Sequence, residues 1–133
     1  MPRLDAIGIV VSSMTDSTEF YRHLGLEFPA GSEDEGHLEA ETPGGIRVML
    51  DTEDMMKSFS DWEPPKEGGQ RTTLAFLCET PDEVNRLHLL LTGIGGSTVV
   101  APFDAPWSMR YATIADPDGN HFDLFAHQEQ PSA

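Results

Sequence analysis

The stretch DPDGNHFDLFA, residues 116–126, decides how the C-terminal part of this chain folds. Its Asp118-Gly119 dipeptide is typical of a tight turn, because glycine accepts backbone angles that other residues rarely adopt. After the turn, apolar residues alternate with a second set that includes His121 and Asp123, which predicts a β-strand with one apolar face. A carboxylate on the less apolar face of such a strand suits either a metal ligand or a hydrogen-bonding group in a pocket.

The elements upstream of this strand follow from the same signals. In the second half of the chain, apolar runs, alternation and helical spacing predict a strand at 72–78, a helix at 81–92, a strand at 97–100, a connection at 101–107, and a strand at 109–115 that forms a hairpin with 121–126. In the first half they predict a strand at 4–11, a helix that begins at Asp16 or Ser17 and stops at Gly25, and strands at 26–28, 37–42 and 46–50. Residues 51–70 contain turn formers and lack a sustained period, so a linker or a loop that covers a pocket is expected there.

The two halves of the chain repeat each other. Residues 6–9 match residues 73–76 at an offset of 67 positions, and the turn at 43–45 matches the turn at 117–119 at an offset of 74. A unit of this kind cannot bury its sheet face alone, so two copies are expected to join. The prediction is a single α+β domain over residues 1–133, with βαβββ repeats at 1–51 and 71–128, a joining loop at 52–70, and a curved mixed sheet around a cleft.

Composition limits the class of partner. The formal net charge of −15 argues against nucleic acid and anionic membranes, which attract clusters of lysine and arginine. No apolar run reaches the ~18 residues that a membrane span needs, and the N-terminal residues lack the layout of a secretory signal, so a cytoplasmic protein is expected. The single cysteine, Cys78, excludes an internal disulfide and a cysteine-based zinc cluster, and its apolar strand predicts a buried side chain.

Two motifs carry a resemblance to a known family. The segment FYRHLGLEF at 20–28, which follows a helix start, and the DPDGN turn before the last strand are similar to those of the vicinal oxygen chelate superfamily, which includes glyoxalases, dioxygenases and bleomycin resistance proteins. The resemblance spans nearly the whole chain. It implies the glyoxalase/bleomycin resistance/dioxygenase fold and a homodimer, while the activity has to be argued from the site.

The resemblance also implies where a metal ion would be bound. In metal-dependent members, His or Glu side chains on the first and last strands of each repeat are the ligands, and these positions are Ala6, Met49, Thr73 and Asp123 here. Only Asp123 is a strong donor, whereas zinc and non-haem iron sites use about three protein ligands. The expectation is a protein without a metal cofactor. The alternative is a divalent metal held by His121 and Asp123 with a third ligand from elsewhere.

The same residues define a candidate pocket. By the repeat symmetry it is lined from the matched strands and flanked by aromatic residues, and its members are Ala6, Gly8, Met49, Thr73, Ala75 and Asp123, with Trp62, Trp107, Arg110 and Tyr111 nearby. The small side chains leave room for an organic molecule, and the rings can stack on a planar or cationic one. Trp107 and Tyr111 can equally be core or dimer-interface residues, and Arg110 can bind an anion or pair with a carboxylate.

Three functions follow as hypotheses. The first is a metal-free protein that binds a small organic molecule, similar to the antibiotic resistance proteins that sequester a drug. The second is a metal-dependent lyase, isomerase or dioxygenase with a non-standard site around His121 and Asp123. The same two residues are candidate catalytic residues for metal-free isomerase or lyase chemistry, because a pocket carboxylate oriented by a histidine can act as a general base. The third is a structural or regulatory dimer without a ligand.

Overall fold

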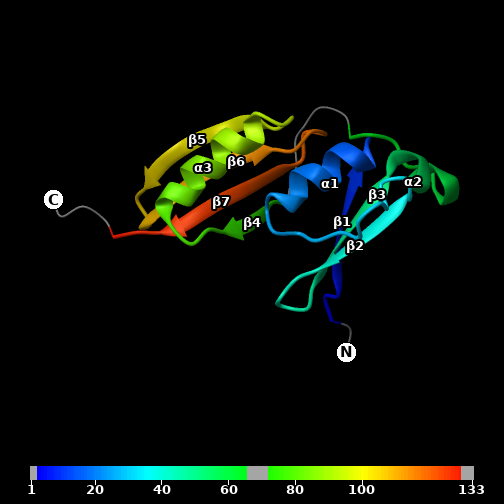
Figure 1. The fold of residues 1–133 in the computed structure, drawn as a ribbon, viewed down its shortest axis with the longest axis horizontal. Helices are drawn as coiled ribbons and strands as arrows, with labels where there is room; N and C mark the ends of the chain where they lie inside the picture. The colour runs from blue at the N-terminus through cyan, green and yellow to red at the C-terminus, as the bar shows by residue number, and fades with distance from the viewer. Residues whose placement is uncertain (1–2, 66–71, 130–133) are drawn as a thin grey trace. The chain divides into compact units, whose positions relative to one another are not determined.

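The structure, a computed structural model, describes residues 3–65 and 72–129 (Figure 1). The chain divides into two compact units, Met1–Glu67 and Gly68–Ala133, called unit 1 and unit 2 below. The elements are β1 (Ala6–Val11), α1 (Met14–Arg22), β2 (His37–Glu41), β3 (Arg47–Thr52), α2 (Glu53–Phe59), β4 (Leu74–Leu77), α3 (Pro81–Thr92), β5 (Ser97–Ala105), β6 (Met109–Ala115) and β7 (His121–His127).

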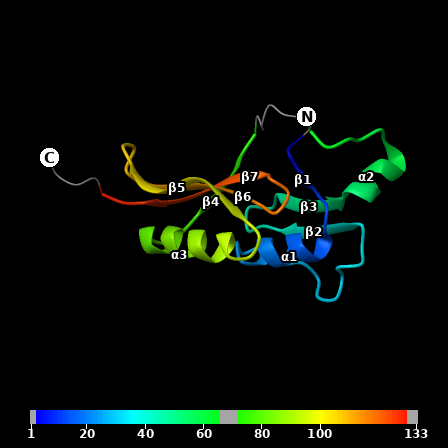
Figure 2. The same ribbon diagram turned by 90° about the horizontal axis from the view of Figure 1, so that it is seen from above.

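Unit 1 contains a three-stranded mixed sheet in the order β1-β3-β2. β1 pairs with β3 in parallel, and β2 pairs with β3 in the antiparallel sense. Helix α1 lies along one face of this sheet (Figure 2), and Val11, Phe20, Tyr21 and Leu50 are fully buried in the core of the unit. The helix begins two or three residues earlier than predicted, because the Ser13 hydroxyl caps it by accepting a hydrogen bond from the backbone of Asp16.

Unit 2 contains a four-stranded mixed sheet in the order β4-β7-β6-β5, with α3 along one face (Figure 2). The helix buries Val84, Leu87 and Leu91, and the sheet buries Ile114 and Leu124. The predicted hairpin is confirmed, since β6 and β7 pair in the antiparallel sense across the turn at 116–120. The α+β class with mixed sheets is confirmed in both units.

The strand pairings bear out the internal repeat. Gly8 lies beside Met49 in unit 1, and Ala75 lies beside Asp123 in unit 2, so both offsets read from the sequence hold in the register of the sheets. The helix starts agree as well, because Thr80, which is 67 positions after Ser13, caps α3 through the backbone of Glu83. The two units are thus built on equivalent strand pairs.

Three segments differ from the prediction. Residues 26–28 are not a strand; Leu26 and Phe28 are buried as core side chains, and Pro29 follows directly and offers no backbone donor. β5 extends through the expected connection to Ala105, because the backbone continues to pair with β6 past two irregularities in the register. Residues 53–59 form α2 within the expected loop; its seven residues are too few to show a helical period in the sequence.

The remaining general predictions concern Cys78 and the membrane. Cys78 is 4% exposed, and burial is the main cause that raises its pKa to about 11, so the predicted buried thiol is confirmed. Among the described residues, no helix is long and apolar enough to cross a bilayer.

Candidate functional site

The face of the unit 2 sheet opposite α3, called the open face below, carries Asp123 and several of the residues predicted to line a pocket. Residues along β7 alternate, so Phe122 and Leu124 are buried toward α3 while Asp123 and Phe125 are only half-buried on the other side. The strand pairings place three further side chains on this face, namely Ala75 from β4 and Tyr111 and Thr113 from β6. The prediction that one face of this strand is apolar and the other carries Asp123 is confirmed.

Asp123 is held by two hydroxyl groups. Tyr111 donates its hydroxyl proton to one carboxylate oxygen, and the Thr113 hydroxyl donates to the other at 2.7 Å. Burial, followed by the hydrogen bond to the Asp123 carboxylate, raises the pKa of Tyr111 to about 12. Tyr111 therefore stays a neutral hydrogen-bond donor over the physiological pH range.

Tyr111, whose hydroxyl is bonded to this carboxylate, belongs to a group of three contacting rings called the aromatic cluster: Phe103, Trp107 and Tyr111. The ring centroids of Trp107 and Tyr111 are 5.6 Å apart, and those of Phe103 lie 6.1 Å from Trp107 and 6.2 Å from Tyr111. All three pairs are edge-to-face, the arrangement that aromatic quadrupoles favour. Trp107 remains 53% exposed, so part of its surface is available for a further contact.

Phe103 was missed as a site residue because its segment was expected to be a connection. It pairs with Tyr111 across β5 and β6, and this places the two rings on one face. The available signal was the regular four-residue spacing of Phe103, Trp107 and Tyr111 around a hairpin.

The structure separates Arg110 from the open face. As the neighbour of Tyr111 on β6, Arg110 points to the opposite side of the sheet, where its Nε donates to Asn85 Oδ1 of α3 at 3.0 Å. Its Nη1 donates to Asp104 Oδ1 at 3.1 Å. Of the alternatives read from the sequence, the pairing with a carboxylate is the one present.

The other predicted site residues of unit 2 lie as follows. Ala75 is beside Asp123 in the sheet, whereas Thr73 precedes β4 and is exposed. His121 is half-buried and lies on the same face of β7 as Asp123, two residues away. Both carboxylate oxygens of Asp123 accept hydroxyl protons, from Tyr111 and Thr113, and the pairing of His121 with Asp123 stays a prediction.

The predicted site residues of unit 1 leave less room than expected. Met49 lies beside Gly8, and its Cε is 3.8 Å from the position that a Gly8 Cβ would take, so the methionine side chain covers the glycine. Ala6 pairs with Arg47 at the start of the same two strands. Trp62 is half-buried after α2. The expected meeting of Ala6 and Met49 with Thr73 and Asp123 joins the two units and stays a prediction.

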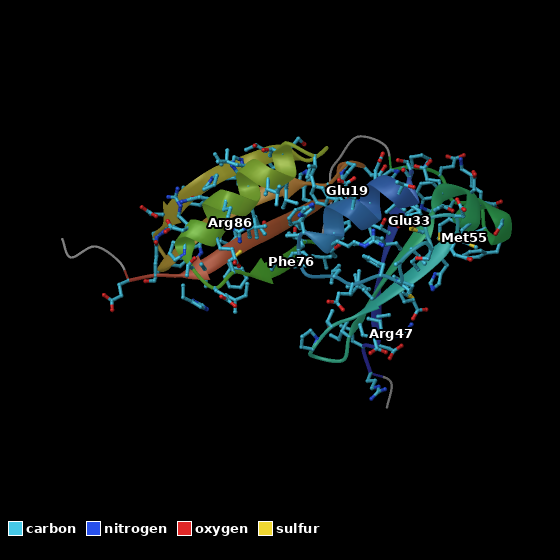
Figure 3. All side chains as sticks on the ribbon, viewed as in Figure 1. Glu19, Glu33, Arg47, Met55, Phe76 and Arg86 are labelled. Carbon is cyan, nitrogen blue, oxygen red and sulfur yellow. The ribbon has the colours of Figure 1, made fainter. Side chains whose placement is uncertain are left out.

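The face of the unit 1 sheet that carries Met49 also holds a chain of charges. Arg47 donates to Asp5 at 2.6 Å and to Glu39 (Figure 3), and His37 contacts Glu39 through Nε2 at 2.8 Å and Asp51 through Nδ1 at 2.6 Å. The hydrogen bonds to Glu39 and then to Asp51 raise the pKa of His37, and the bond to His37 is the main cause that lowers the pKa of Glu39. Because both ring nitrogens face carboxylates, the cationic form of His37 is favoured.

Unit 1 also contains an acidic hollow that the sequence argument did not predict as a site. Its volume is about 290 Å³, and it is lined by Ser12, Met14, Glu33, Asp34, Glu35, Gly36, Thr52, Glu53 and Asp54. Glu33 is already paired with Arg22 at 3.3 Å (Figure 3).

The residues at the implied metal positions do not fit a divalent metal. In unit 1 the implied positions hold Ala6 and Met49, which offer no oxygen or nitrogen side-chain donor. In unit 2 they hold Thr73, whose hydroxyl is a weak ligand, and Asp123, both of whose oxygens accept hydroxyl protons. In the part of the chain that the structure describes, no three His, Cys, Asp or Glu side chains form a group suited to a metal ion.

Comparison with known proteins identifies similar chains. The family model of the Glyoxalase/Bleomycin resistance protein/Dioxygenase superfamily matches residues 3–124. No curated protein matches the chain.

Solved structures show the same fold at low sequence identity. A glyoxalase/bleomycin resistance protein/dioxygenase family enzyme from Burkholderia phytofirmans PsJN matches with a TM-score of 0.75 and 17% identity, over 95% of this chain and 99% of that one. A glyoxalase-related enzyme from Fulvimarina pelagi matches with a TM-score of 0.77 and 16% identity, over 96% and 89%. A glyoxalase family protein from Bacillus cereus matches with a TM-score of 0.72 and 20% identity, over 97% and 96%. At these identities the likeness concerns the fold alone.

Proposed function

Because the chain belongs to the glyoxalase/bleomycin resistance protein/dioxygenase superfamily, we propose that it binds a small organic molecule on the open face of unit 2 without a metal ion. The observation that carries the proposal is the aromatic cluster beside Asp123, with Trp107 half exposed. Exposed aromatic surface next to a fixed polar group is typical of a small-molecule site, because the rings supply contact area and the polar group sets orientation.

The charges of unit 2 favour a planar ligand that is cationic or uncharged. The open face carries the carboxylate of Asp123. The two described arginines of this unit lie elsewhere: Arg86 is on α3 (Figure 3), and Arg110 is held on the helix-facing side by Asn85 and Asp104. A cation over the ring faces also gains from the aromatic quadrupoles. Sequestration of an antibiotic is the biological form of such binding that the family resemblance favours.

A matched series of planar compounds tests the ligand class. Ethidium is cationic, riboflavin is uncharged and adenosine monophosphate is anionic. We expect ethidium to raise the melting temperature most, since a ligand at 100 times its Kd stabilises the folded state by about 2.7 kcal/mol. Adenosine monophosphate is expected to leave the melting temperature unchanged. A shift by the anion alone, or by none of the three, would count against the proposed site.

Substitution of Trp107 tests whether the ligand binds on the open face. In a Trp62→Phe background Trp107 is the remaining tryptophan, so quenching of its fluorescence reports the open face. Trp107→Ala is expected to weaken ethidium binding about tenfold, because an aromatic pair contributes roughly 0.5–1.5 kcal/mol beyond its contact area. Leu89→Ala on α3 removes an apolar side chain of the same unit that is even more exposed, at 72%, and is expected to leave the Kd unchanged. Equal effects of both substitutions would refute the location.

Metal analysis tests the proposal that the protein binds its ligand without a metal ion. Purified protein is analysed for zinc, nickel, iron and manganese by mass spectrometry, alongside Asp123→Ala. We expect less than one metal ion per ten chains in both proteins, because Asp123 is the single strong donor among the four implied ligand positions. A stoichiometric metal that the substitution abolishes would favour the metal-dependent enzyme instead.

A further inference from the structure

We infer that Asp123 and Thr113 are positioning residues: Thr113 orients the Asp123 carboxylate, and that carboxylate binds the Tyr111 hydroxyl and holds the ring in the aromatic cluster. The inference rests on the proposed function, because it assigns these two residues a task in building the ligand-binding face. Asp123 stands at a position where the family resemblance implies a metal ligand. In this chain it orients the ring of Tyr111 instead.

The strand register makes this arrangement possible. Thr113 lies directly opposite Asp123 in the pairing of β6 with β7, and Tyr111 lies two residues away on the same face of β6. Opposite and diagonal neighbours on one face of a sheet are within reach of each other's side chains. One carboxylate therefore accepts hydrogen bonds from both hydroxyls, and each of its oxygens is directed by a different residue.

Tyr111 is consequently fixed at two points. Its hydroxyl is bound to Asp123, and its ring makes edge-to-face contacts with Phe103 and Trp107. When the Asp123 carboxylate is removed, the Tyr111 hydroxyl loses this hydrogen-bond acceptor. The Tyr111 ring can then rotate about its side-chain torsions. Since Trp107 is exposed and contacts Tyr111, the order of Trp107 depends on that of Tyr111.

A positioning role predicts a different pattern of substitutions from a metal-binding or basic role. In Asp123→Asn, the amide oxygen still accepts the Tyr111 proton and the amide nitrogen donates to the Thr113 oxygen, so the cluster is retained. In Asp123→Leu, a side chain of similar size offers no acceptor. If Asp123 were a metal ligand or a general base, both substitutions would abolish that role. If Asp123 is a positioning residue, only Asp123→Leu abolishes its role.

The experiment compares near-ultraviolet circular dichroism and acrylamide quenching of Trp107, each in the Trp62→Phe background and without ligand. Wild type and Asp123→Asn are expected to share the aromatic dichroism bands and the quenching constant. Asp123→Leu is expected to lose the bands and to become more quenchable. Tyr111→Phe, which keeps the ring and removes the hydroxyl, is expected to raise the quenching constant of Trp107 as Asp123→Leu does, and Thr113→Ser is expected to behave like wild type.

Two controls keep the outcome decisive. Far-ultraviolet dichroism and melting temperature establish that each variant is folded, and Tyr111→Phe replaces Asp123→Leu if the latter unfolds. Wild-type quenching of Trp107 in Tyr111→Phe would overturn the inference, as would loss of the wild-type bands and quenching constant in folded Asp123→Asn. Ethidium binding is not part of these measurements, so a wild type that binds no planar compound would defeat the proposed function and leave the positioning role standing.

Discussion

Asp116 closes the turn that aligns the last two strands of the chain. It is 2% exposed, and its carboxylate accepts hydrogen bonds from the backbone of Asp118 at 2.9 Å and of Asn120 at 2.8 Å, and from the Asn120 side-chain amide at 2.9 Å. Gly119 has a φ of +87° in this turn, which other residues rarely adopt. The turn therefore depends on one buried carboxylate and one glycine.

Asp116→Ala is expected to lower the free energy of unfolding by about 1–3 kcal/mol, because the partly buried donors of the turn lose their acceptor. Urea denaturation followed by circular dichroism measures the change. Asp118→Ala, which truncates an exposed carboxylate in the same turn, serves as the matched control and is expected to cost less. Equal losses in the two variants would show that Asp116 contributes no more than an ordinary surface aspartate.

The contacts of single residues also show what could not be predicted from the sequence. The carboxylate of Asp123 and the aromatic character of Tyr111 were recognised from the sequence, but the bond between them was not, because it depends on a diagonal contact between two strands. Arg110 was expected near the same site, yet strand alternation turns it to the other face. Neighbouring residues on a strand are adjacent in sequence, but their side chains lie on opposite faces of the sheet.

At the level of elements, β2 and β3 are joined by a pH-sensitive contact as well as by backbone hydrogen bonds. His37 and Asp51 are opposite each other in the register, and Glu39 lies on the same face of β2 with Arg47 of β3 beyond it. Asp5, before β1, is bonded to Arg47 and completes the row. The charges alternate in sign only while the imidazole of His37 is protonated.

The sign of the resulting pH dependence follows from the raised pKa of His37. A group that binds its proton more tightly in the folded state stabilises the fold fully below its unfolded pKa, which is about 6.5 for histidine. That contribution is lost as the pH rises through the folded pKa. The melting temperature is therefore expected to fall on going upward from about pH 6.5, and His37→Gln is expected to flatten this dependence.

Thermal unfolding monitored from pH 5.5 to 9 checks the His37 prediction. His88→Gln provides the control, because His88 is bonded to the hydroxyl of Thr98 and faces no carboxylate among its described contacts. A wild-type profile that His37→Gln leaves unaltered, or that His88→Gln removes instead, would contradict the assignment.

The elements themselves were predictable where local rules apply. The helices were found from their apolar spacing, and the capping residues Ser13 and Thr80 recur at the same offset as the strands. The short helix α2 and the full length of β5 were not found, since the first has too few residues for a period and the second is held by pairing with β6 across register irregularities.

For the whole molecule, the open sheets of both units leave edge strands, which are β1 and β2 in unit 1 and β4 and β5 in unit 2. Unpaired edges are surfaces on which another chain can add. The homodimer that the family resemblance implies stays a prediction, and the net charge of −15 opposes it. Two copies would repel each other unless salt screens the charges.

Sedimentation equilibrium tests this prediction directly. We expect a species of twice the 14.6 kDa chain mass, and we expect its dissociation constant to decrease from 50 mM to 500 mM sodium chloride as screening reduces the repulsion. A monomer at every salt concentration and at high protein concentration would refute the homodimer.

The sequence by itself determined the features that depend on near neighbours along the chain: the turn at 116–119, the alternation of β7, the internal repeat with its offsets, the family, and the weakness of the donor set at the four implied ligand positions. The tertiary structure decided which side chains meet. In the folded chain, Asp123 accepts hydrogen bonds from Tyr111 and Thr113, Met49 covers Gly8, and His37 lies between two carboxylates. The physical reason is that a contact between strands is set by register and by the face that each residue occupies, and both are fixed only when residues distant in the sequence pair.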